Sequence, residues 1–205
     1  CVPIGLLTAI LMGFYCPKRI YGSLKPCTEL VAGIPSIVYG FFGMVVVVPV
    51  IRNLFGGTGN SVLTVSIILG IMILPTIVGM SVSALKAVPD SYYEGAVALG
   101  ATHEGAVATV VFPAAKSGIL ASVILAVGRA IGETMAVIMI AGNSTIIPRS
   151  LLDSVRTLTG KIVIEMSYAE GLPYDALIGT GVVLFVFILL LNRCFNLVTN
   201  RKDKG

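Results

Sequence analysis

Five stretches of the sequence consist almost entirely of apolar residues and are separated by more polar connections. The first covers about residues 1–16, and the other four run over about residues 30–51, 61–85, 117–142 and 176–198. At 1.5 Å per residue, a helix over each of these four is roughly 30 Å long or more, which matches the hydrocarbon core of a bilayer. The pattern therefore predicts an all-α, polytopic helical membrane protein.

The first apolar stretch, Val2 to Cys16, is about fifteen residues long. A spanning helix needs ~20 residues. The chain also begins with Cys1 instead of methionine, and its apolar run starts at once. We therefore expect this stretch to be the final part of a span, in a fold that is N-terminally incomplete.

Composition supports a membrane protein and gives its orientation. The chain is 56% hydrophobic and 12% charged, whereas soluble domains have about a quarter charged residues. Lys and Arg are concentrated in alternate connections, which the positive-inside rule places in the cytoplasm. The connections thus assigned to the cytoplasm carry Lys18, Arg19, Lys25, Lys86, Lys116, Arg193, Arg201, Lys202 and Lys204. This assignment makes 143–175 an extracytoplasmic loop, where the amphipathic segment 150–166 predicts one or two short interfacial helices. No cluster of basic residues suggests nucleic-acid binding.

The cytoplasmic connection over residues 88–113 reads VPDSYYEGAVALGATHEGAVATVVFP. It predicts two short helices joined at Gly100, because glycine accepts the left-handed conformation of a sharp turn. Ser91 and Glu94 have the spacing of a capping box at the start of the first helix.

The second of these helices is expected to begin after Thr102, a suitable N-cap, and to end at Pro113. Tyr92, Tyr93 and Val97 offer large side chains of the type that anchor interfaces. From the residues alone, an ordinary pair of interfacial helices and a docking element remain equally open.

A resemblance favours the docking element. The spacing of this segment resembles the EAA signature of ABC importer permeases, which reads E-A-A, three residues, G, nine residues, I, one residue, L-P. The matching positions are Glu94, Gly95, Ala96, Gly100, Val110, Phe112 and Pro113. Gly95, Val110 and Phe112 depart from that signature in identity but not in spacing. The resemblance implies that Glu94, Gly95, Ala96, Gly100 and Pro113 couple the chain to an ATP-hydrolysing subunit, and that the fold is the type I (MetI-like) importer permease fold over residues 1–205.

No catalytic site is predicted in this chain. Its Gly160-Lys161 pair lacks the upstream glycine of a phosphate-binding P-loop and lies on the predicted outer side. The four cysteines have no metal-binding spacing. We therefore expect a non-enzymatic subunit without metal or cofactor, and we expect ATP and Mg²⁺ to be bound by a partner chain.

The segment GRAIGETMAV places Arg129 and Glu133 inside the fourth apolar stretch. On a continuous helix the two share one face. Each charge costs roughly 2.5–3.5 kcal/mol at the centre of a span, so both should face protein or a water-filled path. Gly128 and Gly132 have GxxxG spacing and predict close helix packing beside the pair.

Two interpretations of the charged pair are possible: a polar contact between helices, or part of a substrate path. An Arg guanidinium donates in the fork geometry that suits phosphate oxygens. A carboxylate can accept the proton of monohydrogen phosphate but repels fully ionised sulfate, so Arg129 with Glu133 favours a protonated phosphate.

GRAIGETMAV resembles the corresponding motif of phosphate-specific ABC permeases, and its ending is more similar to the PstC-type subunit. The segments ELVAGIPSIVYGFFG and SLLDSVRTLTGKIVIEM resemble that subunit as well. The resemblance implies a multi-pass protein of the bacterial plasma (inner) membrane with Arg129 and Glu133 in the path. The implied partners are a PstA-type permease subunit, a dimer of ATP-binding subunits and an extracytoplasmic phosphate-binding protein. Alternatives are a permease of the same fold for sulfate or molybdate, and an ATP-independent channel or secondary transporter.

Overall fold

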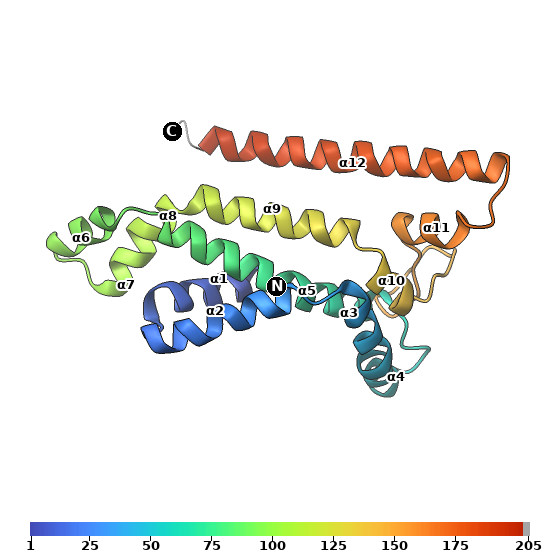
Figure 1. Ribbon diagram of the computed structural model, residues 1–205, viewed down its shortest axis with the longest axis horizontal. Helices are drawn as coiled ribbons and strands as arrows, with labels where there is room; N and C mark the ends of the chain where they lie inside the picture. The colour runs from blue at the N-terminus through green and yellow to red at the C-terminus, as the bar shows by residue number, and fades with distance from the viewer. Residues whose placement is uncertain (203–205) are drawn as a thin grey trace. The chain divides into compact units, whose positions relative to one another are not determined.

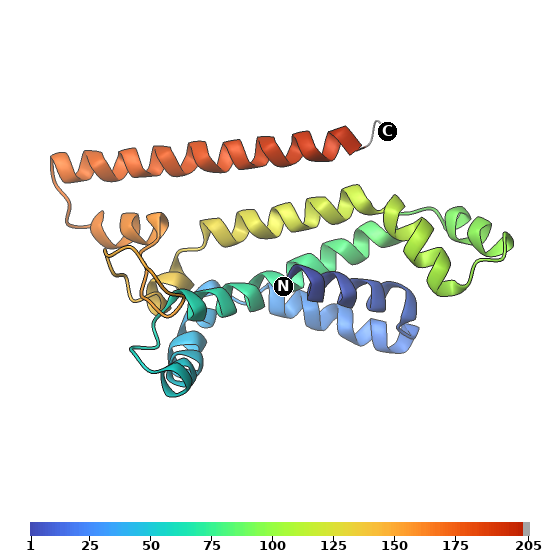
Figure 2. The same cartoon turned by 180° about the vertical axis from the view of Figure 1, so that it is seen from behind.

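The computed structural model describes the backbone of residues 1–202 and the side chains of residues 1–17 and 19–195. Every regular element in this part of the chain is a helix, which confirms the all-α class (Figures 1 and 2). The elements are α1 Val2–Ile10, the π-helical turn η1 Leu11–Tyr15, α2 Lys18–Ala32, α3 Ser36–Phe42, the π-helical turn η2 Gly43–Val47, α4 Val48–Phe55, α5 Val62–Lys86, α6 Asp90–Ala98, α7 His103–Ala106, the π-helical turn η3 Val107–Val111, α8 Phe112–Ala114, α9 Lys116–Gly132, α10 Met135–Ile140, α11 Leu158–Glu165 and α12 Leu172–Lys202.

Three helical segments of the described chain are long and apolar enough to cross a membrane: Ser36–Phe55, Val62–Lys86 and Leu172–Phe195. A fourth span is formed if the pair His103–Ala114 and Lys116–Gly132, bent by 66°, is counted as one. Only 6% of the most apolar part of α12 is buried within the chain. Such a surface suits lipid or another membrane subunit.

The boundaries differ from the sequence-based ones at the second apolar stretch. Residues 18–32 form the helix α2, whereas the sequence predicts a polar connection between the apolar stretches that end at about residue 16 and begin at about residue 30. Charge counting marks this segment as polar but does not separate a loop from an amphipathic helix. The next helix starts at Ser36 because Pro35 is its N-cap, and the residue before a proline is disfavoured in the helical region.

The chain forms two compact units, built mainly from Cys1–Gly33 with Ile73–Val127 and from Ile34–Met72 with Gly128–Cys194. In the first unit, α1 and η1 pack against α5 and the start of α9. Its buried core contains Ala9, Met12, Val78, Val82, Leu85, Ala115 and Ile119. Ser81 and Ser122 share a buried hydrogen bond of 2.8 Å between their hydroxyl oxygens, so the polar groups of this core are paired.

In the second unit, α10 packs closely against α3. Gly40 makes this approach possible, because a Cβ there would lie 2.8 Å from the sulfur of Met139 and 2.9 Å from the Cα of Ala136. The small residue on α3 therefore lets two membrane helices touch backbone to backbone.

Loop 143–175, predicted to be the outer loop, lies in the second unit and caps the start of α5. The amide of Val62 donates to the carbonyl of Asp153 at 3.0 Å, and the amide of Leu63 donates to Leu151 at 2.8 Å. These bonds satisfy donors that a helix N-terminus leaves without intrahelical partners. Within the loop, the amphipathic segment forms one helix, α11, and residues 143–157 are irregular.

Candidate substrate path and coupling surface

The fourth apolar stretch is broken at the charged pair. Helix α9 ends at Gly132 and α10 begins at Met135, so the continuous helix expected over 117–142 is wrong. Glu133 lies in the break. Its Oε1 accepts a hydrogen bond of 3.2 Å from the amide of Ala136, and its carbonyl accepts one of 3.2 Å from the hydroxyl of Thr159. The carboxylate therefore caps the first turn of α10.

The break changes the geometry inferred for Arg129 and Glu133. Arg129 lies exposed on the last turn of α9, whereas Glu133 is partly buried beyond its end. The argument that both share one helical face is thus wrong, because the helix does not continue between them. Both residues nevertheless lie next to a helix end inside an apolar segment, where the last carbonyl groups of a helix lack intrahelical partners.

The environment of Arg129 includes a residue that the sequence did not single out. Tyr39 of α3 is 7% exposed, and the charge of Arg129 acts on it electrostatically. Its position shortly after Pro35 in an apolar helix gives no signal in the sequence, because a tyrosine there equally suits a core or a membrane interface. Tyr39 becomes a candidate only through the packing of the second unit.

The GxxxG pair has space beside it. A Cβ at Gly128 or at Gly132 would meet no described atom within 4 Å. Close packing at these glycines is therefore not made by the described part of this chain, and their predicted role in helix packing stays a prediction that needs another subunit.

The segment 88–113, predicted to be cytoplasmic, forms a hairpin of helices, α6 and α7, which bends at Gly100 (Figure 1). Gly100 has a φ of +90°. Its amide donates to Val97 at 2.9 Å, and the amide of Ala101 donates to Ala96 at 3.1 Å, the pair of bonds that defines a Schellman motif. The turn predicted at Gly100 is therefore present in the structure.

The helix caps of the hairpin agree with the sequence in one of two cases. Thr102 accepts a hydrogen bond of 3.1 Å from the amide of Gly105, which confirms it as the N-cap of α7. The capping box of Ser91 and Glu94 is wrong, because α6 begins at Asp90 with Pro89 as its N-cap, so that Ser91 lies inside the helix. Pro113 lies in the first turn of α8, where its missing amide hydrogen costs little.

The hairpin exposes most of the side chains of α6. No residue of α6, all of which the structure describes, is buried. Leu99 is 92% exposed, and Tyr92 and Val97 are also exposed. Glu94 and Gly95 lie on the same short helix and are exposed too. An apolar surface of this kind, flanked by a carboxylate, is typical of an interaction site.

The inner side of the hairpin is held by a cluster of rings that sequence analysis missed. The hydroxyl of Tyr93 on α6 lies 2.8 Å from Nδ1 of His103 on α7. The ring of Tyr15, from η1, meets the same imidazole edge-on at 5.0 Å between centroids. His103 therefore joins both helices of the hairpin to the first apolar helix.

The chain matches the model of one protein family over residues 2–204, the binding-protein-dependent transport system inner membrane component. It belongs to this family. Membership makes the chain an inner membrane component of a binding-protein-dependent transport system, and its long apolar helices make it a multi-pass protein.

Three curated relatives extend the comparison. The chain is 40% identical to the probable ABC transporter permease YqgH of Bacillus subtilis, over 92% of this chain and 63% of that protein. It is 35% identical to the phosphate transport system permease PstC of Mesorhizobium japonicum, over 93% and 64%. Identity to PstC of Haemophilus influenzae is also 35%, over 94% and 68%. The chain thus spans a little under two thirds of the length of the first two relatives.

Solved structures show the same fold. A structure of the inward-facing MetNI methionine ABC transporter superposes with a TM-score of 0.74 at 20% identity, covering 97% of this permease and 85% of that chain. A bacterial transporter that imports the polysaccharide alginate gives 0.64 at 14% identity, covering 97% and 72%. These similarities confirm the predicted MetI-like fold and carry no information on the substrate.

The ring cluster gives the first prediction for this permease. Tyr93→Phe removes the hydroxyl bonded to His103 and should cost about 1 kcal/mol of local stability. Amide hydrogen exchange in α6 and α7 is expected to speed up several-fold, measured by mass spectrometry. Tyr92→Phe is the matched control, because that side chain is exposed. Equal exchange rates in the two variants would contradict a tethering role for the hydroxyl.

Proposed function

We propose that this chain is the PstC-type permease subunit of an ATP-driven phosphate importer and forms half of the translocation path. The observation that carries the proposal is the break between α9 and α10, where Arg129 and Glu133 flank a helix end within an apolar segment. The relatives named PstC, at 35% identity, support phosphate as the substrate.

The chemistry of the break suits a protonated phosphate. Arg129 offers parallel N–H donors to two oxygens of the anion. Glu133 uses Oε1 to cap α10, and a carboxylate has further lone pairs that can accept the hydroxyl proton of monohydrogen phosphate. Sulfate at neutral pH has no such proton, so the same carboxylate repels it.

Transport in this proposal follows alternating access. A phosphate-binding protein delivers the anion on the side of loop 143–175. A dimer of ATP-binding subunits, which holds ATP and Mg²⁺, docks against the hairpin of α6 and α7 through the region of Glu94, Gly95, Ala96, Gly100 and Pro113. A PstA-type subunit completes the path. The exposed face of α6 supports the docking role, and the chain itself performs no hydrolysis.

A permease for sulfate or molybdate is the second candidate. It differs from the first in what Glu133 does, so the deciding variant is Glu133→Gln. The amide oxygen of glutamine can still accept the bond from Ala136, which leaves the cap of α10 in place while the charge is removed.

The experiment measures uptake of labelled phosphate into vesicles that contain the permease complex, with and without its ATPase subunit and with excess sulfate. We expect ATP-dependent phosphate uptake that sulfate does not inhibit. In Glu133→Gln, sulfate should compete at least roughly ten-fold better, which corresponds to about 1.4 kcal/mol. Uptake that is independent of the ATPase, or stronger uptake of sulfate by the unaltered complex, would refute the proposal.

A further inference from the structure

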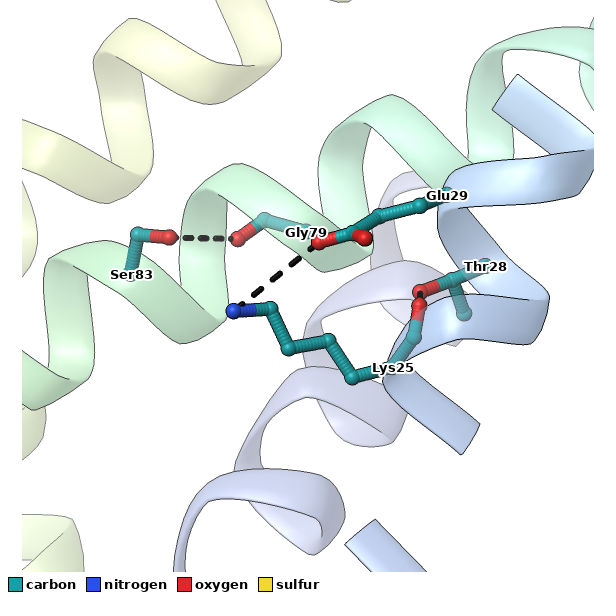
Figure 3. Close-up of polar contacts among 5 residues, drawn as sticks. All are labelled: Lys25, Thr28, Glu29, Gly79 and Ser83. Atoms are coloured by element: carbon teal, nitrogen blue, oxygen red, sulfur yellow. Dashed lines mark hydrogen bonds and ion pairs between the residues drawn. The ribbon is translucent and has the colours of Figure 1, made fainter. Parts of the chain in front are cut away.

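A groove of about 710 Å³ lies between α2 and the second half of α5, entirely within the first unit. Figure 3 shows Lys25 and Glu29 on α2 next to the stretch of α5 that contains Gly79 and Ser83. By the positive-inside rule, the lysines at its rim, Lys25 and Lys86, are on the cytoplasmic side. The groove therefore belongs to the cytoplasmic half of the permease.

One face of α5 is unusual for a membrane helix. Its residues Val78, Val82 and Leu85 are buried in the core of the unit. Val78 and Val82 also line the groove, and beside them lie Thr76, Gly79 and Ser83, which at spacings of three and four form a stripe along the helix. The stripe ends at Lys86, whose charge is costly against lipid and makes the groove a candidate site for a polar ligand.

The two cations of the groove are held loosely. Nζ of Lys25 lies 3.9 Å from Oε1 of Glu29, and these side chains are 58% and 68% exposed. Nζ of Lys86 lies over the ring of Tyr21, 3.4 Å from its centroid. An exposed ion pair and a cation–π contact are both weak, so an anion with several oxygens can compete for both ammonium groups.

Two hydroxyl groups and one carboxylate at the groove act as acceptors. The hydroxyl of Thr28 donates to the carbonyl of Lys25 at 2.8 Å, and the hydroxyl of Ser83 donates to Gly79 at 3.0 Å (Figure 3). Because these hydrogens are used within the helices, the hydroxyl oxygens present lone pairs, as does the carboxylate of Glu29. Two ammonium donors beside such acceptors complement an anion that carries both bare and protonated oxygens.

We propose that this groove binds a phosphate group, with Lys25 and Lys86 as its cationic ligands. Inorganic phosphate leaving the transport path and the headgroup of an anionic phospholipid offer this same chemistry. The first source rests on the proposed function, whereas the second does not. Either occupant is bound at the point where α5 leads into the coupling hairpin.

The first test replaces both lysines in the complete complex, Lys25→Gln with Lys86→Gln, in vesicles of phosphatidylcholine with or without phosphatidylglycerol. Lys116→Gln is the matched control, an exposed cytoplasmic lysine outside the groove. If inorganic phosphate is the ligand, the double variant loses at least roughly ten-fold in uptake in both lipids. If a headgroup is the ligand, phosphatidylglycerol stimulates the unaltered complex and the double variant loses only that stimulation.

Uptake and lipid response equal to those of Lys116→Gln would overturn the inference while leaving the proposed function intact. Absence of phosphate uptake by the unaltered complex would instead refute the proposed function. In that case the effect of phosphatidylglycerol on ATP hydrolysis by the complex, with and without the double substitution, decides whether the groove binds a headgroup.

A second variant tests the groove without removing charge. A Cβ at Gly79 would meet no described atom within 4 Å, so the side chain of Gly79→Leu begins in open space, and it reduces the room for a ligand because Gly79 lines the groove. In vesicles with phosphatidylglycerol we expect it to reduce uptake as much as the double lysine substitution does, while the subunits still co-purify. Gly22→Leu, at an equally open position of α2 outside the groove, should leave uptake unchanged. Normal uptake by Gly79→Leu would overturn a role for the groove in transport.

Discussion

Replacing Arg129 with glutamine should reduce phosphate uptake by on the order of 100-fold or more. Two charge-assisted hydrogen bonds to an anion contribute roughly 1.5–3 kcal/mol each, and every 1.36 kcal/mol is a factor of ten. Arg129 is exposed within the chain, so its loss opens no cavity in the core. The complex should therefore assemble normally, and the defect should appear in transport alone.

The measurement is initial uptake of labelled phosphate, together with co-purification of the ATPase subunit. Arg129→Lys keeps the charge but not the planar fork, and it should recover only part of the activity. Arg19→Gln, in the cytoplasmic part of α2, is the control and should transport normally. Uptake near normal in Arg129→Gln would assign Arg129 to contacts between helices and remove it from the path.

Replacing Gly100 with valine should uncouple ATP hydrolysis from transport. Gly100 has a φ of +90°, where a β-branched residue costs on the order of 1–3 kcal/mol. A Cβ there would touch no described atom within 4 Å. The penalty is therefore conformational, and it acts on the bend that presents α6 to its partner.

Gly100→Asn separates conformation from crowding, because asparagine tolerates the left-handed region far better than valine. A conformational origin predicts coupling in the order Gly, Asn, Val, measured as phosphate transported per ATP hydrolysed. If Asn and Val are equally defective, side-chain bulk at the docking surface is the cause. If both couple normally, the hairpin does not carry the ATP-driven motion, and a channel or secondary transporter becomes the better interpretation.

The features that the sequence predicted well are those that depend on local chemistry. An apolar run in a membrane protein must form a helix, because the bilayer offers its backbone no hydrogen-bond partners. A bend that needs a left-handed residue requires Gly100, and an orphan amide at a helix start requires a cap such as Thr102. Each of these needs only a few neighbouring residues.

The features that were missed depend on distant contacts. The carbonyl of Glu133, in the break between α9 and α10, accepts a hydrogen bond from Thr159, 26 residues later in the chain. Hydropathy does not detect this contact, so the sequence predicts one continuous helix. The bond between Tyr93 and His103 exists only because the hairpin folds back at Gly100. The groove exists because α2 lies beside α5, although α3 and α4 separate these two helices in the chain. Apolar periodicity contains none of these pairings.

The amides of Val62 and Leu63 donate to carbonyl groups of Asp153 and Leu151. The loop 143–175 therefore supplies acceptors that a preceding turn of α5 would otherwise provide. The positive-inside rule predicts that Leu151–Asp153 lie outside the cell. A protein that binds them there would hold the first turn of a helix of 25 residues, whose other end precedes the hairpin of α6 and α7. Pulling the loop away would break these hydrogen bonds and unwind the first turn of α5, whereas holding the loop in place would stabilise that turn. An external partner could therefore act on α5 without contacting the substrate.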